Sequence, residues 1–353
     1  MSRRSLLCCA VPMLSISLAA SAEEYRFSGP YTHDNLSIFL IHGAQRQRAR
    51  SFLTLQEALH QKKVVVYETG NVNQLAIENF SGEDVYIQSG DIVKGGQQDR
   101  VFPDDFVLPK TSGRMPISSF CVEQGRWTRR GTERADRFSA SADTLPTKSL
   151  KLAARKSENQ QQVWEQVAMA RVEITESAVN YDRTDGTHLG TGVGGGVGGG
   201  VRTFSPPSAS STSMQLALEN KKVTEATEAY IKHLSKIVES QPDAIGYAFA
   251  INGKLNSADV YASRELFARM WPKLLKASAI EAMAGRSREK SSFGLDAAAI
   301  RAAFADAERG HATSKDVNHR LDVVMRETDK AVLFETRDRE QGGAAIHKSY
   351  VMK

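Results

Sequence analysis

Short apolar segments rich in β-branched residues follow one another through the first third of the chain. Turn-forming pairs such as Gly70-Asn71 and Ser112-Gly113 separate them. Short strands with turn signals at regular spacing predict an antiparallel meander of the sandwich or partial-barrel type. One helix interrupts this meander, because Thr54 and Glu57 form a capping box ahead of an apolar helical face. The expected strands cover residues 36–42, 64–67, 75–79, 85–88, 100–102 and 116–122.

Helical periodicity replaces the strand pattern from residue 157 onward. A capping box at Ser157 and Gln160 precedes an apolar helical face over residues 163–178. The chain then becomes rich in glycine and afterwards in proline, serine and threonine. Because such a segment cannot bury enough surface to offset its ordering entropy, we expect a disordered insert at about residues 184–213. Its glycines lack the Gly-Lys-Ser/Thr of a phosphate loop, and no cofactor is expected.

The last third of the chain mixes helices with strands. Asn252-Gly253 between two apolar runs predicts a β-hairpin. Pro272 should kink or restart the helix that Ser263 caps. Mixed rather than alternating elements indicate the α+β class, with an antiparallel sandwich-like N-terminal half and a mixed helix and antiparallel-strand C-terminal half. The expected elements are helices at 223–237, 263–275 and 295–308, and strands at 244–251, 254–261, 321–326, 332–336 and 344–352.

The first 22 residues have the layout of a cleaved secretory signal. A basic start at Arg3-Arg4 precedes an apolar stretch over residues 6–20, and Ala20-Ser21-Ala22 supplies the small residues of a cleavage site. The alternative is a membrane anchor that is never cut, which Pro12 and the short apolar run disfavour. We therefore expect a signal peptide over residues 1–22 and a periplasmic or secreted protein.

Composition and charge narrow the class of the mature chain, residues 23–353, which we expect to form a single domain. The whole sequence is 41% hydrophobic and 25% charged, which excludes a fibrous or globally disordered protein. Cleavage leaves 44 basic and 41 acidic residues, so the net charge falls from +5 to +3. Such a small excess does not favour a nucleic-acid partner. No apolar run long enough for a stable membrane span remains, and Cys121, left alone, cannot form an internal disulfide.

Polar residues cluster between residues 68 and 127, each group at the end of an expected strand and beside glycines. Glycine lets a backbone approach a ligand closely, and sites are commonly built on loops held by a sheet. The alternative is that the glycines only make turns and the charges are solvated. The candidate ligand-binding residues are Glu68, Asn71, Asp91, Gln98, Arg100, Glu123, Arg126 and Trp127.

The same groups, in this order, resemble the core of a known domain family. The strings are Glu68-x-Gly70-Asn71, Gly90-Asp91, Gly95-Gly96-Gln97-Gln98-Asp99-Arg100 and Cys121-Val122-Glu123-Gln124-Gly125-Arg126-Trp127. They are similar to the ARG and Rhodanese-Phosphatase-superfamily-associated protein domain. The resemblance implies association with ADP-ribosylglycohydrolase or rhodanese-phosphatase proteins. It supplies no established activity, so the function of the family remains uncharacterised.

Three functions stay open on these residues. The first is binding of a small anionic or nucleotide-like ligand. Arg100 and Arg126 can each form two parallel hydrogen bonds to a phosphate or carboxylate, and Trp127 can supply a ring face for stacking. The second is a metal- or carboxylate-dependent hydrolase, in which acids such as Glu68 and Glu123 would act as general acid and base. The third is a non-catalytic envelope interaction or scaffold protein, in which the same residues pair with one another.

Two further kinds of chemistry find less support. Cys121 could act as a nucleophile only if a histidine reached it, and no histidine lies nearby in the sequence. No zinc motif is present, since His311 and His319 are eight residues apart and no paired-cysteine motif exists. A buried, inert Cys121 and no metal are therefore expected.

The signal peptide generates a direct prediction. Because cleavage is expected after Ala22, mass spectrometry of the protein purified from its native host should find Glu23 at the N-terminus. An intact Met1 terminus on a cytoplasmic protein would contradict both the signal peptide and the location.

Overall fold

The structure, a computed structural model, describes residues 25–44, 51–141, 145–184, 212–286 and 294–353. The expected signal peptide and residues 185–211 of the expected insert lie outside the described residues. At the borders of that insert, Thr184 ends one helix and Ser213 caps the next.

An eight-stranded sheet, antiparallel throughout, runs through the molecule. Its order is β1-β2-β13-β14-β18-β17-β16-β15, so strands from the N-terminal half pair directly with strands from the C-terminal half. Both halves of the sequence therefore contribute strands to one sheet. Its strands are β1 (Arg26–His33), β2 (Leu36–His42), β13 (Ala244–Ile251), β14 (Lys254–Tyr261), β15 (His311–Asp316), β16 (Leu321–Glu327), β17 (Ala331–Asp338) and β18 (Ala344–Met352).

Helices cover both faces of this sheet. On one face, α6 and α5 pack on the strands through a core that includes Leu40, Tyr247 and Phe267. On the other face, α7 packs through Ile300 and Phe304. Of the helices that the structure describes, none combines the length and apolarity needed to cross a bilayer. The helices are α1 (Leu55–His60), α2 (Lys148–Leu152), α3 (Gln160–Thr184), α4 (Met214–Leu218), α5 (Lys221–Leu234), α6 (Arg264–Ala284) and α7 (Ala297–Glu308).

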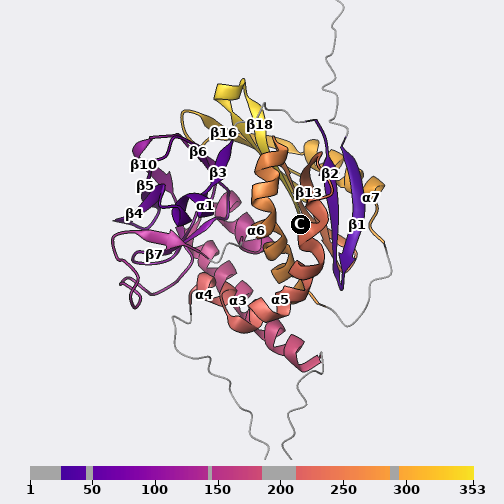
Figure 1. Cartoon of the computed structure of the whole chain (residues 1–353), viewed down its shortest axis with the longest axis horizontal. Coiled ribbons are helices and arrows are strands. Elements are labelled where there is room, and N and C mark those ends of the chain that lie inside the picture. Colours follow the sequence, from indigo (N-terminus) through magenta and orange to yellow (C-terminus); the bar gives the residue numbers. More distant parts are fainter. Residues whose placement is uncertain (1–24, 45–50, 142–144, 185–211, 287–293) are drawn as a thin grey trace, which may run out of the picture.

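Three small sheets gather at one side of the molecule, with α6 between them and the β1–β2 hairpin (Figure 1). Their orders are β10-β5-β4, β11-β8-β7-β12 and β3-β6-β9. All pairs are antiparallel except β3 and β6, which are parallel and are separated in the chain by α1, β4 and β5. These strands are β3 (Phe52–Thr54), β4 (Val64–Asn71), β5 (Gln74–Asn79), β6 (Asp84–Ile87), β7 (Ile92–Gly95), β8 (Arg100–Val101), β9 (Phe106–Leu108), β10 (Gly113–Ser118), β11 (Phe120–Cys121) and β12 (Phe138–Ala140).

Local signals in the sequence correspond closely to the structure. The capping box of Thr54 and Glu57 forms at the start of α1. Asn252 and Gly253 both have positive φ, as the tight turn between β13 and β14 requires. The α+β class is confirmed, since both helices and antiparallel sheets are extensive.

One local expectation is wrong, and of the two alternatives at Pro272 the restart is excluded. Asn159, rather than Ser157, caps α3, because its side chain accepts from the backbone N–H groups of Gln161 and Gln162. The Gln160 amide instead bonds to the backbone N–H and C=O of Cys121, which ties α3 to β11. The α6 helix continues through Pro272 and does not restart there.

A buried histidine joins the small sheets to the large one. His347 on β18 lies with Nδ1 2.9 Å from Asp105 Oδ2 and Nε2 3.1 Å from Asp259 Oδ1. Carboxylates only accept hydrogen bonds, so both ring nitrogens must donate and the ring must be an imidazolium. Arg155 and Thr336 also donate to Asp105. The loop before β9 is thereby attached to β18 and, through His347, to β14 by charged contacts, and to β17 by the Thr336 hydrogen bond.

Burial and ion pairing act in opposite directions on this cluster. Burial opposes the charge on His347, but Asp105 and Asp259 outweigh it and raise the pKa of the ring. Burial alone would raise the pKa of Asp105, yet His347 and Arg155 lower it far below its ordinary value. The pKa of Asp259 is also lowered, because the His347 hydrogen bond and the Lys151 charge outweigh burial.

These directions predict a pH profile for stability. Because the pKa of His347 is raised in the folded protein, the ring contributes fully to stability below the unfolded-state pKa of about 6.5. This stabilisation is lost as the pH rises through the pKa of the folded state. Because the pKa values of Asp105 and Asp259 are lowered in the folded protein, both carboxylates contribute fully to stability above the unfolded-state pKa of about 3.9. Their stabilisation is lost as the pH falls through the pKa values of the folded state. The free energy of unfolding should therefore be greatest between about pH 4 and 6.5.

Replacement of the histidine checks the cause. His347→Gln should lower the free energy of unfolding by about 3–5 kcal/mol near pH 5.5, because the buried Asp259 loses its imidazolium partner and the buried Asp105 keeps only Arg155. Denaturant unfolding across pH should also show that the decline on the alkaline side has gone. The exposed His311→Gln is the control and should leave the profile unchanged. A His347→Gln profile parallel to that of the wild type would contradict the role of this ring.

Candidate functional site

The motif residues that the sequence brings forward form a buried ion network. Asp99 in the β7–β8 turn and Glu123 after β11 are fully buried, and both accept from Arg126 and Arg130. Residues 122–137 include no strand or helix, so these ion pairs fix that segment to the turn. The network gathers groups from distant parts of the sequence, as antiparallel strands allow.

Arg126 is fully engaged within the chain. Its Nε lies 2.6 Å from Glu123 Oε2, and its Nη2 lies 3.5 Å from Asp99 Oδ1. The remaining N–H groups donate to the carbonyls of Gly95, Gly96 and Thr128. A guanidinium has five N–H donors, so none is left over for a ligand in this arrangement.

Arg100 differs from Arg126, because it is completely buried yet only partly paired. Its Nη1 donates to the carbonyl of Gln98, and Nη2 lies 3.6 Å from a Glu68 carboxylate oxygen. Within the described residues, neither Nε nor Nη2 has a hydrogen-bond partner. The Trp127 ring, 44% exposed, lies 5.7 Å from the guanidinium carbon. Trp127 therefore separates an under-paired cation from solvent.

The other candidate residues take separate places. Asp91 pairs with Lys273 of α6 at 2.6 Å, both buried, and so lies apart from the arginines. Asn71 is exposed and accepts from the N–H of Asn73, which shapes the β4–β5 turn. Gln98 is buried, and its Oε1 has no partner among the described residues.

Cys121 is a buried thiol on β11. Burial raises its pKa to about 11, and Glu68 and Glu123 add to the shift while Arg100 opposes it. A thiol with that pKa is almost fully protonated at neutral pH, so it is a poor nucleophile. The geometry thus favours the inert form of this cysteine.

Ser213 belongs to the network, and sequence reasoning missed it. Its Oγ lies 2.8 Å from Asp99 Oδ2 and also accepts from Leu216 N–H as the cap of α4. Ser213 was missed because it lies at the end of a serine-rich stretch that we expected to be disordered. A serine followed by apolar residues such as Met214 and Leu216 is nevertheless a signal for the start of a helix.

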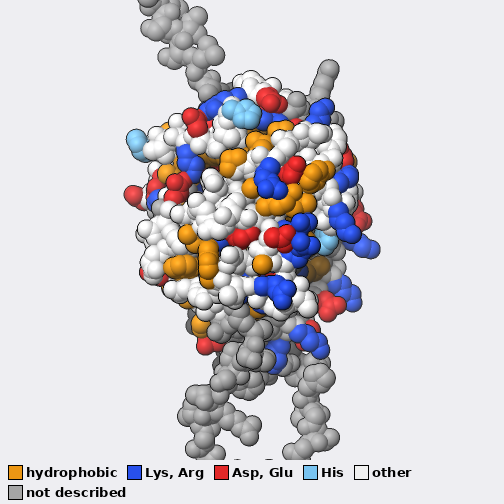
Figure 2. Space-filling view, turned by 90° about the vertical axis from the view of Figure 1, so that its left-hand side faces the viewer, with side chains coloured by type: hydrophobic (Ala, Val, Ile, Leu, Met, Phe, Trp, Pro, Cys, Tyr) orange, Lys and Arg blue, Asp and Glu red, His pale blue; other side chains and the backbone are white. Residues whose placement is uncertain are grey.

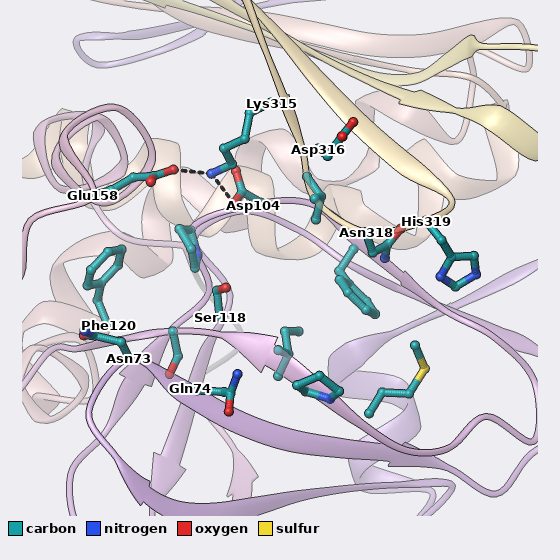
Figure 3. Close-up of a pocket in the computed structure, with 17 residues that line it drawn as sticks. Asn73, Gln74, Asp104, Ser118, Phe120, Glu158, Lys315, Asp316, Asn318 and His319 are labelled. Atoms are coloured by element: carbon teal, nitrogen blue, oxygen red, sulfur yellow. Dashed lines mark hydrogen bonds and ion pairs between the residues drawn. The ribbon is translucent and has the colours of Figure 1, made fainter.

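A cleft of about 580 Å³ lies between the small sheets and the β15–β16 hairpin. Figure 3 shows Asn73, Gln74 and Ser118 on one side, facing Lys315, Asn318 and His319 on the other. Apolar side chains complete the walls, among them Phe106, Met115, Ile117, Phe120 and Val317. No sequence motif pointed to this cleft, because its two sides are far apart in the chain.

Lys315 closes one end of the cleft. Its ammonium pairs with Asp104 at 2.7 Å and with Glu158 (Figure 3). Burial would lower the pKa of Lys315, but these two carboxylates outweigh burial and raise it. Beyond Lys315 lies a smaller cavity of about 150 Å³, which Arg155 and Phe334 help to line. The cleft therefore borders the cluster around His347.

Several polar groups of the cleft have no partner in the described part of the chain. Ser119 is almost completely buried, and its Oγ makes no hydrogen bond there. The side chains of Asn73, Gln74 and Ser118 likewise make none among the described residues. An unpaired buried polar group is costly, so the Ser119 hydroxyl marks a place for water or a ligand. Asn73, Gln74 and Ser118 are exposed, and their side chains can hydrogen-bond to water or to a ligand in the cleft.

Charges on this side of the molecule are mixed. Figure 2 views the face that carries the small sheets, where basic and acidic side chains alternate with small apolar patches. Over the described ranges, no set of three or more His, Cys, Asp or Glu side chains is arranged to hold a metal ion. The cleft itself combines paired charges with neutral amides and hydroxyls.

Comparison with known proteins places the chain in a family. The model of the ARG and Rhodanese-Phosphatase-superfamily-associated Protein domain matches residues 24–351, so the chain belongs to that family. No curated protein matches significantly. No solved structure matches significantly either.

The ion network generates a mutational prediction. Arg126→Ala should lower the free energy of unfolding by about 3 kcal/mol, because two buried carboxylates each lose a cation while Arg130 still contacts both. Arg134→Ala removes an exposed pair with Asp136 and is the matched control, with no measurable loss expected. Urea unfolding of both variants checks this. Equally small losses would contradict the structural role of Arg126 and make it available to a ligand.

Proposed function

We propose that this member of the family binds a small uncharged molecule rich in hydroxyl or amide groups, of sugar or nucleoside size, in the cleft. The observation that carries the proposal is the combination of apolar walls with the buried Ser119 hydroxyl, which has no partner among the described residues. Exposed hydroxyl and amide side chains that make no hydrogen bond within the described residues lie in the same cleft. Small-molecule sites typically have volumes of about 300–1,000 Å³ and combine apolar walls with a few polar groups. The cleft, at about 580 Å³, falls within this range.

The charges of the cleft support a neutral ligand over an anion. Lys315 is its one ammonium among the described lining residues, and Asp104 and Glu158 already neutralise it. Asp316 pairs with Arg339. A phosphate entering here would meet carboxylates without an available cation, whereas hydroxyl and amide groups could pair with Asn73, Gln74 and Ser118.

The second candidate function is binding of a small anion, as the sequence favoured. The site would be Arg100, which lies beneath the Trp127 ring. The specific observation is that Arg100 Nε and Nη2 lack partners within the described residues. An anion that displaced the Trp127 ring would satisfy both donors in forked geometry. The neighbouring Glu68 carboxylate, 3.6 Å from Nη2, opposes an anion, so we rank this candidate second.

The remaining alternatives have less support. A carboxylate-dependent hydrolase would need accessible acids, but Asp99 and Glu123 are buried and paired with arginines. A periplasmic or secreted location remains part of the proposal and rests on residues 1–22 alone. A soluble ligand of the cell envelope would suit a binding protein in that place.

Ligand screening with paired variants tests the proposal. Purified protein is melted with adenosine, AMP, inorganic phosphate and a set of monosaccharides. A neutral probe at ten times its Kd should add about 1.4 kcal/mol to the free energy of unfolding. Ser118→Trp, which fills the cleft, should abolish this gain, whereas Ser118→Ala keeps the cleft open and should preserve it.

The outcomes separate the two candidates. A gain that survives Ser118→Trp, or the absence of any gain with the neutral probes, would contradict binding in the cleft. A response to phosphate that disappears in Trp127→Ala and persists in Ser118→Trp would favour the Arg100 site instead.

A further inference from the structure

A serine, a histidine and an aspartate line up at the β1–β2 edge of the large sheet. The hydroxyl of Ser28 on β1 lies 2.8 Å from Nε2 of His42, the last residue of β2. Nδ1 of the same ring lies 2.8 Å from Oδ1 of Asp243, which directly precedes β13. This edge is opposite to the β15 edge that borders the cleft.

The hydrogen bonds fix the roles of the three side chains. The Asp243 carboxylate can only accept, so Nδ1 of His42 carries a proton. In the neutral ring Nε2 then has its lone pair toward Ser28, whose hydroxyl donates to it. The His42 hydrogen bond is the main reason that the pKa of Asp243 is lowered, and so the carboxylate stays ionised. This is the order of contacts found in serine hydrolases.

The backbone supports this arrangement. Ser28 and His42 lie on the same side of the β1–β2 ladder, because Leu40 pairs with Ser28 and precedes His42 by two residues. The register shifts directly after Ser28, and bulges of this kind often re-aim a side chain beside an active site. Gly29 in this bulge has a φ of +106°, and a Cβ there would approach Ile38 O to 2.7 Å. Glycine is therefore required next to the serine.

The serine, the histidine and the aspartate are buried to different degrees. His42 is almost completely buried, Ser28 is half-buried, and Asp243 is 47% exposed. Arg26 also pairs with Asp243 and holds the carboxylate from the solvent side. The ring is thus shielded, while the serine residue is partly exposed.

We propose that Ser28, His42 and Asp243 form a second site, a hydrolytic one that acts on small carboxylic esters. Ser28 Oγ forms a bond to the ester carbonyl carbon while its proton passes to His42 Nε2. The carbon–alkoxy bond then breaks, and the leaving alkoxide takes that proton as an alcohol. A water molecule attacks the acyl-serine in the same way, its proton passes through Nε2 to Ser28 Oγ, and a carboxylic acid leaves. Asp243 is a positioning residue that holds the ring and stabilises the imidazolium.

Covalent labelling tests this site in the full chain. A biotinylated fluorophosphonate should form a bond from phosphorus to Ser28 Oγ with loss of fluoride, and peptide mass spectrometry should place it on Ser28. Ser28→Ala should abolish labelling. His42→Gln should slow it at least 100-fold, since general-base catalysis contributes about 10²–10⁴-fold. Ser37→Ala, at a half-buried serine of the same hairpin that bonds only to Thr32 among the described residues, is the control and should label normally.

The role of Asp243 needs a readout beyond rate. Asp243→Asn should slow labelling and move the midpoint of its pH dependence to lower pH, because the imidazolium loses its carboxylate. Thermal melting checks that each variant is folded, and Ser28→Ala is a minimal change if His42→Gln fails to fold. Wild-type protein that remains unlabelled at Ser28, or that labels as fast in folded His42→Gln, would overturn the proposal.

Discussion

The charged contact of His347 with Asp105 and Asp259 is the constraint on which the rest of the structure depends. It is fully buried and joins the loop before β9 to the middle of the eight-stranded sheet. A buried cation with one carboxylate removed would be strongly destabilised, so the three groups must stay together. The small sheets are therefore held in one position relative to the large sheet.

The cleft follows from that position. Asp104, next to Asp105 in the chain, forms an ion pair with Lys315 of β15. Arg155, which pairs with Asp105, lines the smaller cavity next to the cleft. A second group of ion pairs lies near the cleft. Arg320 contacts Asp338 of β17 and Asp84 of β6, and so connects these two strands. These ion pairs neutralise Lys315 and Arg320 at this border, and neutral amides and hydroxyls lie beside them in the cleft between the small sheets and the β15–β16 hairpin.

The sequence predicted what short-range signals determine. The Thr54 capping box and the Asn252-Gly253 turn depend on residues within a few positions, and both are confirmed. Strands β1 and β15 were missed because their largely exposed side chains carry no apolar period. Hairpin geometry led us to expect that Glu68, Asp91, Arg100, Glu123 and Arg126 converge. Arg100 does lie beside Glu68, and Arg126 beside Glu123. Asp91 instead pairs with Lys273 of α6, a partner about 180 residues away that no hairpin signal indicates. The cleft and the Ser28–His42–Asp243 series depend on pairs about 200 residues apart, such as His42 with Asp243, which no local pattern encodes.

The protonation of His347 tests the central claim most directly. In a ¹⁵N-labelled sample, NMR of the side chain should detect protons on both Nδ1 and Nε2, with a titration midpoint above the ordinary histidine value of about 6.5. Two N–H signals, slow to exchange with solvent because the ring is buried, are the expected result. A single N–H at pH 6, which means a neutral ring beside a protonated carboxyl group, would contradict the account.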